Sequence, residues 1–362
     1  MKKRVTLLLS VFCCLFIYGQ KSYQYSAPKE TGDGWKTDGS WFQKVDTSKI
    51  YQLFQQLYNA KHKINSVLLV KDNVLILEEY FNKRSIDQQQ DLRSTSKSIR
   101  SILLGIALDK GFIDDVNDPI SKYLKTHQPK KKLDPRKADI TIANLITMST
   151  GLECNDWDRK SKGQEDRVYK KKDWIQYTLD LPMVNNPGEV SNYCSMGVVI
   201  LAEIISQASG MSIDEFADKY LFAPLGIENV SWGHTSEKKV IASGKRLNMT
   251  PRDMAKIGQL ILNKGMWKEA RVVSQKWVEK SISPKTTITG INYGYLWWKL
   301  PFFVKDKLHL STAATGNGGQ YILIFHEINM IAVFTGSAYN SQEDKIPFVI
   351  MKDVLLPTLF RH

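Results

Sequence analysis

The order of apolar patterns along the 362 residues constrains the fold more than any other feature of the sequence. Short apolar runs typical of strands occur near both ends of the chain, at 66–70, 74–80, 294–298, 321–325 and 330–335. Between about residues 95 and 281, apolar residues recur mainly with the spacing of helices. The simplest packing joins the two ends of the chain in one antiparallel sheet and inserts the helical block between them.

The predicted fold is therefore of the α/β (α+β) class, with the sheet flanked by an N-terminal helix at 48–61 and a closing helix at 342–356. Asp72 and Asn73 separate two strand-like runs and predict a β-hairpin. We assign residues 48–92 and 286–362 to the α/β part of one domain, 48–362, and residues 93–285 to its helical part. Reactive groups are expected in the cleft between the two parts.

The first 19 residues have the organisation of a secretory signal peptide. Three basic residues at 2–4 precede an apolar run from Val5 to Tyr18, and Gly19 and Gln20 mark the expected cleavage region. The run is shorter than the span of about 20 residues that a membrane requires, although an uncleaved anchor is the alternative. We expect an exported protein, periplasmic or extracellular, with no stable membrane span after cleavage. Residues 20–47, which are polar, aromatic and rich in glycine, should form an irregular lead-in.

The chain carries a formal net charge of +13. Such a charge favours either contact with anionic cell-envelope polymers or simple solubility. The densest lysine runs, 130–132 and 170–172, lie in polar segments and are typical of a solvated surface. Nucleic acid is not an expected partner of an exported chain, and a small molecule or a peptide is the expected substrate.

Ser94 and Lys97 form a Ser-x-x-Lys pattern at the start of a strongly periodic helix expected over 97–110. A serine at a helix start lies beside free backbone N–H groups, and the helix dipole favours an oxyanion there. A lysine three residues later lies on the same face of the helix. A lysine can act as a base when burial and positive neighbours lower its pKa. The alternative is an ordinary helix cap followed by a solvated lysine.

Two further motifs follow along the chain. Tyr193-Cys194-Ser195 comes after Pro187-Gly188, and Gly316-Asn317-Gly318-Gly319-Gln320 comes directly before an apolar run. With Ser94-x-x-Lys97, they resemble the serine penicillin-binding-protein/β-lactamase superfamily, in particular its class C β-lactamase-like branch of esterases, D-amino-acid peptidases and amide hydrolases. Supporting segments occur in the expected order at 145–152, 250–258 and 293–298.

The resemblance implies a β-lactamase/DD-peptidase-like fold and hydrolysis through an acyl-enzyme on Ser94. Lys97 and Tyr193 would then transfer protons, and the backbone N–H groups of Ser94 and Gln320 would form an oxyanion hole. Ser195 would bridge Lys97 and Tyr193 or contact the substrate. The remaining residues expected at the substrate are Asn317, Gly318 and Gly319.

This sequence departs from the family pattern at Asn317, where Lys or His is usual, and at Ser195, where β-lactamases have Asn. An amide does not attract a carboxylate as a cation does, so we expect an esterase or amidase acting on a small, uncharged acyl substrate. The alternatives are D-amino-acid peptidase, penicillin-binding or weak β-lactamase activity, and a non-catalytic cell-envelope binding protein. The sequence has no Gly-x-Ser-x-Gly elbow and no His-Glu-x-x-His site, so neither metal nor cofactor is expected.

Cys154 and Cys194 are the cysteines that remain after removal of residues 1–19. In an oxidising compartment such a pair favours a disulfide, and two separate buried thiols are the alternative. A bond between them would close a loop of about 40 residues and contribute about 4 kcal/mol in the chain-entropy model. The resemblance implies that both segments lie at the wall of the cleft, which favours the disulfide.

Overall fold

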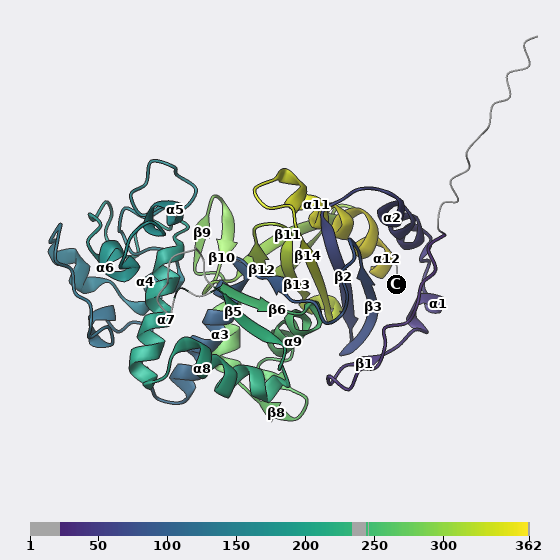
Figure 1. Ribbon diagram of the computed structural model, residues 1–362, viewed down its shortest axis with the longest axis horizontal. Coiled ribbons are helices and arrows are strands. Elements are labelled where there is room, and N and C mark those ends of the chain that lie inside the picture. The colour runs from purple at the N-terminus through teal and green to yellow at the C-terminus, as the bar shows by residue number, and fades with distance from the viewer. Residues whose placement is uncertain (1–21, 234–243, 245, 361–362) are drawn as a thin grey trace, which may run out of the picture.

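The computed structural model of the chain describes residues 22–233, 244 and 246–360 (Figure 1), so the predicted signal peptide lies outside the described residues. Within them, nine strands form one sheet. In spatial order these are β1 (Lys36–Thr37), β3 (Val74–Tyr80), β2 (Ile64–Lys71), β14 (Met330–Gly336), β13 (Gln320–Phe325), β12 (Lys307–Gly316), β11 (Trp298–Val304), β10 (Ile291–Tyr293) and β9 (Thr286–Ile288). Neighbouring strands are antiparallel except β1 and β3, so the two ends of the chain share one sheet as predicted.

The hairpin of β2 and β3 turns at Asp72 and Asn73, whose φ angles are 50° and 65°. Asp and Asn tolerate positive φ better than other residues with side chains, which suits them to a two-residue turn. The strands at the centre of the sheet, β13 and β14, are buried along their whole length. Such continuous burial requires helices on both faces of the sheet.

Helix α9 (Pro251–Leu262) packs on one face of the sheet, where a Cβ on Gly258 would meet the side chains of Ile322 and Ile331. Phe348 of α11 (Ile346–Ile350) packs on the other face, against Tyr321. Figure 1 shows α2 (Ser48–Asn59), α11 and α12 (Leu356–Leu359) together near the β2–β3 end of the molecule.

The closing segment is not one continuous helix, contrary to the prediction for 342–356. A 3₁₀ turn at Gln342–Lys345 leads into α11, a π-helical turn at Met351–Leu355 follows, and α12 completes the segment. Pro347 and Pro357 each lie in the first turn of the α-helix that contains them. Proline has no backbone N–H to donate, so it is tolerated at a helix start and not within a helix.

The helical part lies at the other end of the molecule (Figure 1). Between residues 95 and 217 its helices are α3 (Thr95–Asp109), α4 (Ile142–Ile146), α5 (Glu165–Val168), α6 (Trp174–Leu179), α7 (Ser195–Ser209) and α8 (Ile213–Ala217). Of the later helices in the predicted range 93–285, α9 packs on the sheet and α10 (Gln275–Ile282) contacts α3. Helix α3 contacts both α7 and strand β12, so it lies between the helical part and the sheet. A small sheet of β4 (Gln90–Asp91), β6 (Arg246–Met249) and β5 (Val230–Gly233) lies next to the start of α3.

Two details of the strand prediction were wrong. Residues 294–297 form a turn in which Gly294 N donates to Trp297 O at 2.8 Å, and β11 begins only at Trp298. Strand β12, which no apolar run marks clearly, lies between β11 and β13. The lead-in at 20–47 is largely irregular where the structure describes it, apart from β1 and the short helix α1 (Trp41–Lys44).

No single helix of the described ranges has the length and apolar character that a membrane span requires. By length and composition alone, one bent pair passes the same test, Ser195–Ser209 with Ile213–Leu225.

Candidate active site

Ser94 caps the N-terminus of α3, and Lys97 lies in the first turn of the same helix. The ammonium of Lys97 donates a hydrogen bond to Ser94 Oγ at 2.8 Å, and only 7% of the Lys97 residue is exposed. Within the part of the chain that the structure describes, Ser94 N–H has no hydrogen-bond partner. The Ser94 hydroxyl therefore has the nitrogen of Lys97 beside it, and the Ser94 backbone N–H is free to donate a hydrogen bond.

The turn that carries Ser94 is held to the α/β part of the molecule. Arg93 has a positive φ of 50°, and its backbone N–H donates to Asp91 at 3.0 Å. Thr95 Oγ1 donates to the carbonyl of Gln320 on β13 at 3.0 Å. Ser98 Oγ donates to the carbonyl of Leu296 at 2.6 Å. These contacts fix the start of α3 against the sheet and against the turn before β11.

The aromatic ring of Tyr193 faces the side chain of Lys97. The Lys97 ammonium is 5.0 Å from the ring centroid, a distance at which cation and aromatic face attract each other. The ring is nearly parallel to that of Trp157, at 3° and 4.8 Å, and stacks with Trp298 at 6.0 Å. No hydrogen bond joins the Tyr193 hydroxyl to Ser94 or Lys97 in the described residues, so its contact with the lysine is made by the ring face.

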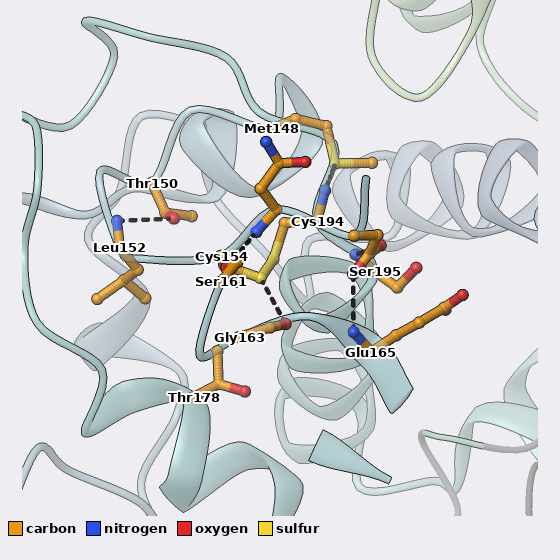
Figure 2. The surroundings of a disulfide bond; sticks show 12 residues. Met148, Thr150, Leu152, Cys154, Ser161, Gly163, Glu165, Thr178, Cys194 and Ser195 are labelled. Atoms are coloured by element: carbon orange, nitrogen blue, oxygen red, sulfur yellow. Dashed lines mark hydrogen bonds between the residues drawn. A yellow bond between two sulfur atoms is a disulfide. The ribbon is translucent and has the colours of Figure 1, made fainter. Parts of the chain in front are cut away.

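Cys154 and Cys194 are joined by a disulfide (Figure 2), so the loop that contains Cys154 is covalently linked to the residue after Tyr193. The Asp156 backbone N–H donates to the carbonyl of Tyr193 at 2.8 Å. Asp156 Oδ2 accepts the backbone N–H of Ser195 at 2.7 Å, and its Oδ1 accepts that of Glu165 at 3.1 Å. The disulfide holds the middle of the Tyr193–Ser195 segment, and Asp156 holds both of its ends.

Asp156 is also a carboxyl near Lys97 whose pKa is shifted. Burial and the charge of Glu165 raise the pKa of Asp156 to about 6, and Lys97 and the hydrogen bond from the Ser195 backbone N–H act in the opposite direction. Sequence reasoning missed this residue because it belongs to no motif. Its place between Cys154 and the exposed Trp157 is the only local signal that could have pointed to it.

Ser195 begins α7, and its hydroxyl lies close to the pocket around Ser94. Ser195 Oγ is buried and has no hydrogen-bond partner among the described residues. The predicted bridge from Ser195 to Lys97 and Tyr193 is therefore not formed here. The other predicted role, contact with a substrate, is compatible with a buried hydroxyl that lacks a partner.

The third predicted element is only partly brought to the site. Asn317 lines the pocket, and its amide exchanges two hydrogen bonds with Asn340, at 2.7 and 2.9 Å. Gln320 does not line the pocket: it is fully buried, and its side chain binds the backbone of Gly336. The pairing of Gly316 with Gln320 places Gln320 inside the sheet, since β13 lies between β12 and β14.

Gly318 and Gly319 form the turn between β12 and β13, with φ angles of 95° and 92°. Neither glycine lines the pocket around Ser94. A Cβ on Gly318 would lie 2.5 Å from the ring of Tyr339, so this position requires glycine for space as well as for its backbone conformation. These glycines shape the turn that presents Asn317.

The pocket around Ser94 and Lys97 has a volume of about 210 Å³ and is largely polar. Three arginines line it, which the motif comparison did not predict: Arg93, Arg100 and Arg246. Two of them share one carboxylate, because Arg93 Nε and Arg246 Nη1 lie 2.9 and 3.1 Å from Asp91 Oδ2. The pairing of β4 with β6 brings Arg246 and Asp91 together.

Comparison with known proteins identifies relatives of the same architecture. A 6-aminohexanoate-dimer hydrolase of Paenarthrobacter ureafaciens is 24% identical over 225 residues, which cover 60% of this chain and 57% of that protein. A penicillin-binding protein homologue from Pyrococcus abyssi superposes with a TM-score of 0.66 at 17% identity, over 86% of this chain and 78% of that one. A D-stereospecific amidohydrolase from Streptomyces sp. gives a TM-score of 0.64 at 12% identity, over 85% of this chain and 98% of that one.

The curated relative is matched over little more than half of its length, and structural likeness at such low identity shows the fold alone. The Beta-lactamase family profile, however, matches residues 53–350, which is most of the chain. The resemblance noted in the sequence and the predicted fold class are both confirmed. The chain belongs to the Beta-lactamase family.

Proposed function

We propose that the protein is a serine hydrolase that forms an acyl-enzyme on Ser94 and acts as an esterase or amidase on a small acyl substrate. The contact that carries this proposal is the 2.8 Å hydrogen bond between Lys97 Nζ and Ser94 Oγ, at the buried start of α3. A nucleophile and a base within hydrogen-bonding distance are the geometric requirement of this chemistry. The position of both at a helix N-terminus and in a pocket supports the same function.

In the proposed reaction, Lys97 first loses one proton to solvent, and Ser94 Oγ then attacks the carbonyl carbon of the substrate while its own proton passes to the resulting amine. The proton then moves to the leaving alkoxide or amine, directly or through the Tyr193 hydroxyl, as the C–O or C–N bond breaks. Water next attacks the acyl-Ser94 ester and gives its proton to the same groups. The acid is released, and the serine hydroxyl is restored.

The oxyanion of each tetrahedral intermediate requires two donors. The unpaired Ser94 N–H supplies the first. We assign the second to the predicted backbone N–H of Gln320, since the carbonyl of Gln320 accepts the hydroxyl of Thr95, the residue after Ser94, at 3.0 Å. Removal of one such donor typically costs about 10²–10³ in kcat.

A second candidate is a peptidase that recognises a terminal carboxylate. It is favoured by Arg93 and Arg246, two cations that share Asp91 beside the nucleophile. Glu165 and Asp166 line the same pocket and reduce its positive charge. The P. ureafaciens relative is named for hydrolysis of an amide dimer, which supports amide hydrolysis as the shared chemistry.

The decisive experiment compares the wild type with Ser94→Ala on p-nitrophenyl butyrate and on an acyl-D-alanyl-D-alanine peptide. We expect Ser94→Ala to lose at least about 10³-fold in rate on the preferred substrate. A serine-reactive fluorophosphonate should label Ser94 in the wild type. Ser85→Ala, which changes an exposed serine that lines neither the pocket around Ser94 nor the cavity of the helical part, is the matched control. Equal rates for wild type and Ser94→Ala would refute the proposal and leave a binding protein of the same fold.

We further propose that this hydrolase acts outside the cytoplasm. Two features support export: the basic and apolar start of the sequence, and a disulfide, a bond that is rare in reducing compartments. Fractionation of cells that express the full chain should recover the protein, cleaved near residue 19, in the periplasm or the medium. Recovery of uncleaved protein in the cytoplasm would contradict this proposal.

A further inference from the structure

A second cavity, of about 520 Å³, lies in the helical part and shares no lining residue with the pocket around Ser94. Its volume falls within the range of about 300–1,000 Å³ that is usual for sites that bind small molecules. Most of its wall is apolar, with side chains such as Ile120, Leu124, Ile140 and Leu152. Apolar walls of this kind suit a hydrocarbon chain.

Lys137 is the buried cation of this cavity wall, with 7% of the residue exposed. Its ammonium donates to the carbonyls of Leu179, at 2.7 Å, and Lys131, at 3.3 Å. An ammonium has three N–H donors, so two carbonyl contacts leave one donor for a further acceptor. Burial lowers the pKa of Lys137, as expected for a cation whose surroundings compensate it incompletely.

Asp134, which also lines the cavity, and Asp180 act on Lys137 by charge, but both are hydrogen-bonded to other groups. Asp134 is held by the guanidinium of Arg136, at 3.0 and 2.8 Å, and Asp180 accepts the backbone N–H groups of Lys130 and Lys131. No carboxylate of the described residues lies within ion-pair distance of the Lys137 ammonium. A buried cation without a carboxylate partner favours an anion supplied from outside the chain.

We propose that this cavity binds a monocarboxylate with an apolar chain, such as a medium-chain fatty acid, whose carboxylate accepts the third N–H of Lys137. The alkyl chain would lie along the apolar wall. This site is separate from the proposed catalytic centre and does not depend on it. It would let the protein bind a fatty acid without hydrolysing any substrate.

Isothermal titration of the wild type with octanoate, octan-1-ol and acetate tests the proposal directly. We expect one saturable octanoate site, binding of octan-1-ol at least about tenfold weaker for lack of the charge-assisted hydrogen bond, and no measurable binding of acetate. Each methylene added from hexanoate to octanoate should tighten binding by about fourfold. Absence of saturable octanoate binding would overturn the proposal.

Two variants locate the site. Lys137→Met should abolish the preference for octanoate over octan-1-ol, and Ala138→Phe, which fills the cavity from an exposed position, should weaken both ligands. Lys130→Met removes an exposed lysine of the same loop and should bind like the wild type. Thermal melts check that each variant is folded. If Lys137→Met does not fold, Ala138→Phe still tests the site. Octanoate binding that persists in both variants would refute this site. Loss of octanoate binding when a fluorophosphonate labels Ser94 would refute it as well.

Discussion

The ammonium of Lys97 lies 2.8 Å from the hydroxyl oxygen of Ser94, one helical turn away along the start of α3. Both groups belong to one rigid element, so their distance does not depend on how the two parts of the molecule move. Tyr193 approaches the same lysine from a different element, which the disulfide and Asp156 hold in place. The contributions of Lys97, the disulfide and Asp156 can be tested separately.

Lys97→Ala should slow the labelling of Ser94 by a fluorophosphonate by about 10²- to 10⁴-fold, the usual contribution of a positioned base. The physical reason is that the serine hydroxyl then has no neighbouring group to take its proton. Labelling rates measured by mass spectrometry check this expectation. Lys110→Ala, at the other end of the same helix, is the control. A Lys97→Ala protein labelled at the wild-type rate would show that Lys97 is not the base.

Replacing either cysteine of the disulfide by serine should lower the free energy of unfolding by about 4 kcal/mol, since the bond joins residues 40 apart in sequence and restricts the unfolded chain. Cys154→Ser, Cys194→Ser and the double variant should lose about the same amount, because each breaks the same bond. Urea unfolding with and without reductant checks this. Losses that add up in the double variant would contradict a single shared bond.

Asp156→Asn should lower the rate of hydrolysis and change its dependence on pH. The ionised carboxylate accepts the N–H groups of Ser195 and Glu165, and bonds to a charged acceptor are the stronger ones. In the wild type, activity should therefore fall as the pH drops through about 6, where Asp156 gains a proton. In Asp156→Asn this step should be absent, and kcat should fall about tenfold with little change in KM. An unchanged pH profile in the variant would contradict a positioning role for Asp156.

Stability should respond to the same group with the opposite sign. Because the pKa of Asp156 in the folded protein lies above that of an ordinary carboxyl, the folded state binds this proton more tightly than the unfolded state does. The contribution of Asp156 to the free energy of unfolding therefore decreases as the pH rises from about 4 to about 6. Urea unfolding across this range should show a steeper decrease for the wild type than for Asp156→Asn. Identical slopes for the two proteins would contradict this linkage.

Gly318→Ala should reduce the free energy of unfolding by about 2–4 kcal/mol, from strain at a φ of 95° and from the 2.5 Å approach of its Cβ to the Tyr339 ring. In a Tyr339→Ala background the backbone strain and a 3.2 Å approach to Gln320 Nε2 remain, so the same substitution should cost about 1–2 kcal/mol. Urea unfolding of the four proteins in this cycle measures the difference. An equal cost in both backgrounds would show that the ring moves aside freely.

Much of the fold and the centre of the site followed from local sequence patterns. The helix at 95–109 and the positions of Ser94 and Lys97 depend on spacings of three and four residues. Residues at these spacings are neighbours on the surface of a helix. The hairpin at Asp72 and Asn73 is equally local. The inserted helical block followed from the order of apolar patterns. If strands at the two ends of the chain pair in one sheet, the helices between them form an insertion.

What the tertiary structure alone decided involves residues far apart in the sequence. The Asp156 carboxylate accepts the backbone N–H of Ser195, Arg246 and Arg93 both pair with Asp91, and the side chain of Gln320 points into the sheet. The sequence spacing of these residues carries no geometric meaning, since their distances follow from strand register and from the packing of α3 between the helical part and the sheet. The sequence by itself thus determined that Ser94 and Lys97, the proposed nucleophile and base, lie within one helical turn. Packing determined the charges and donors around them, because a cleft exists only after both of its walls have folded.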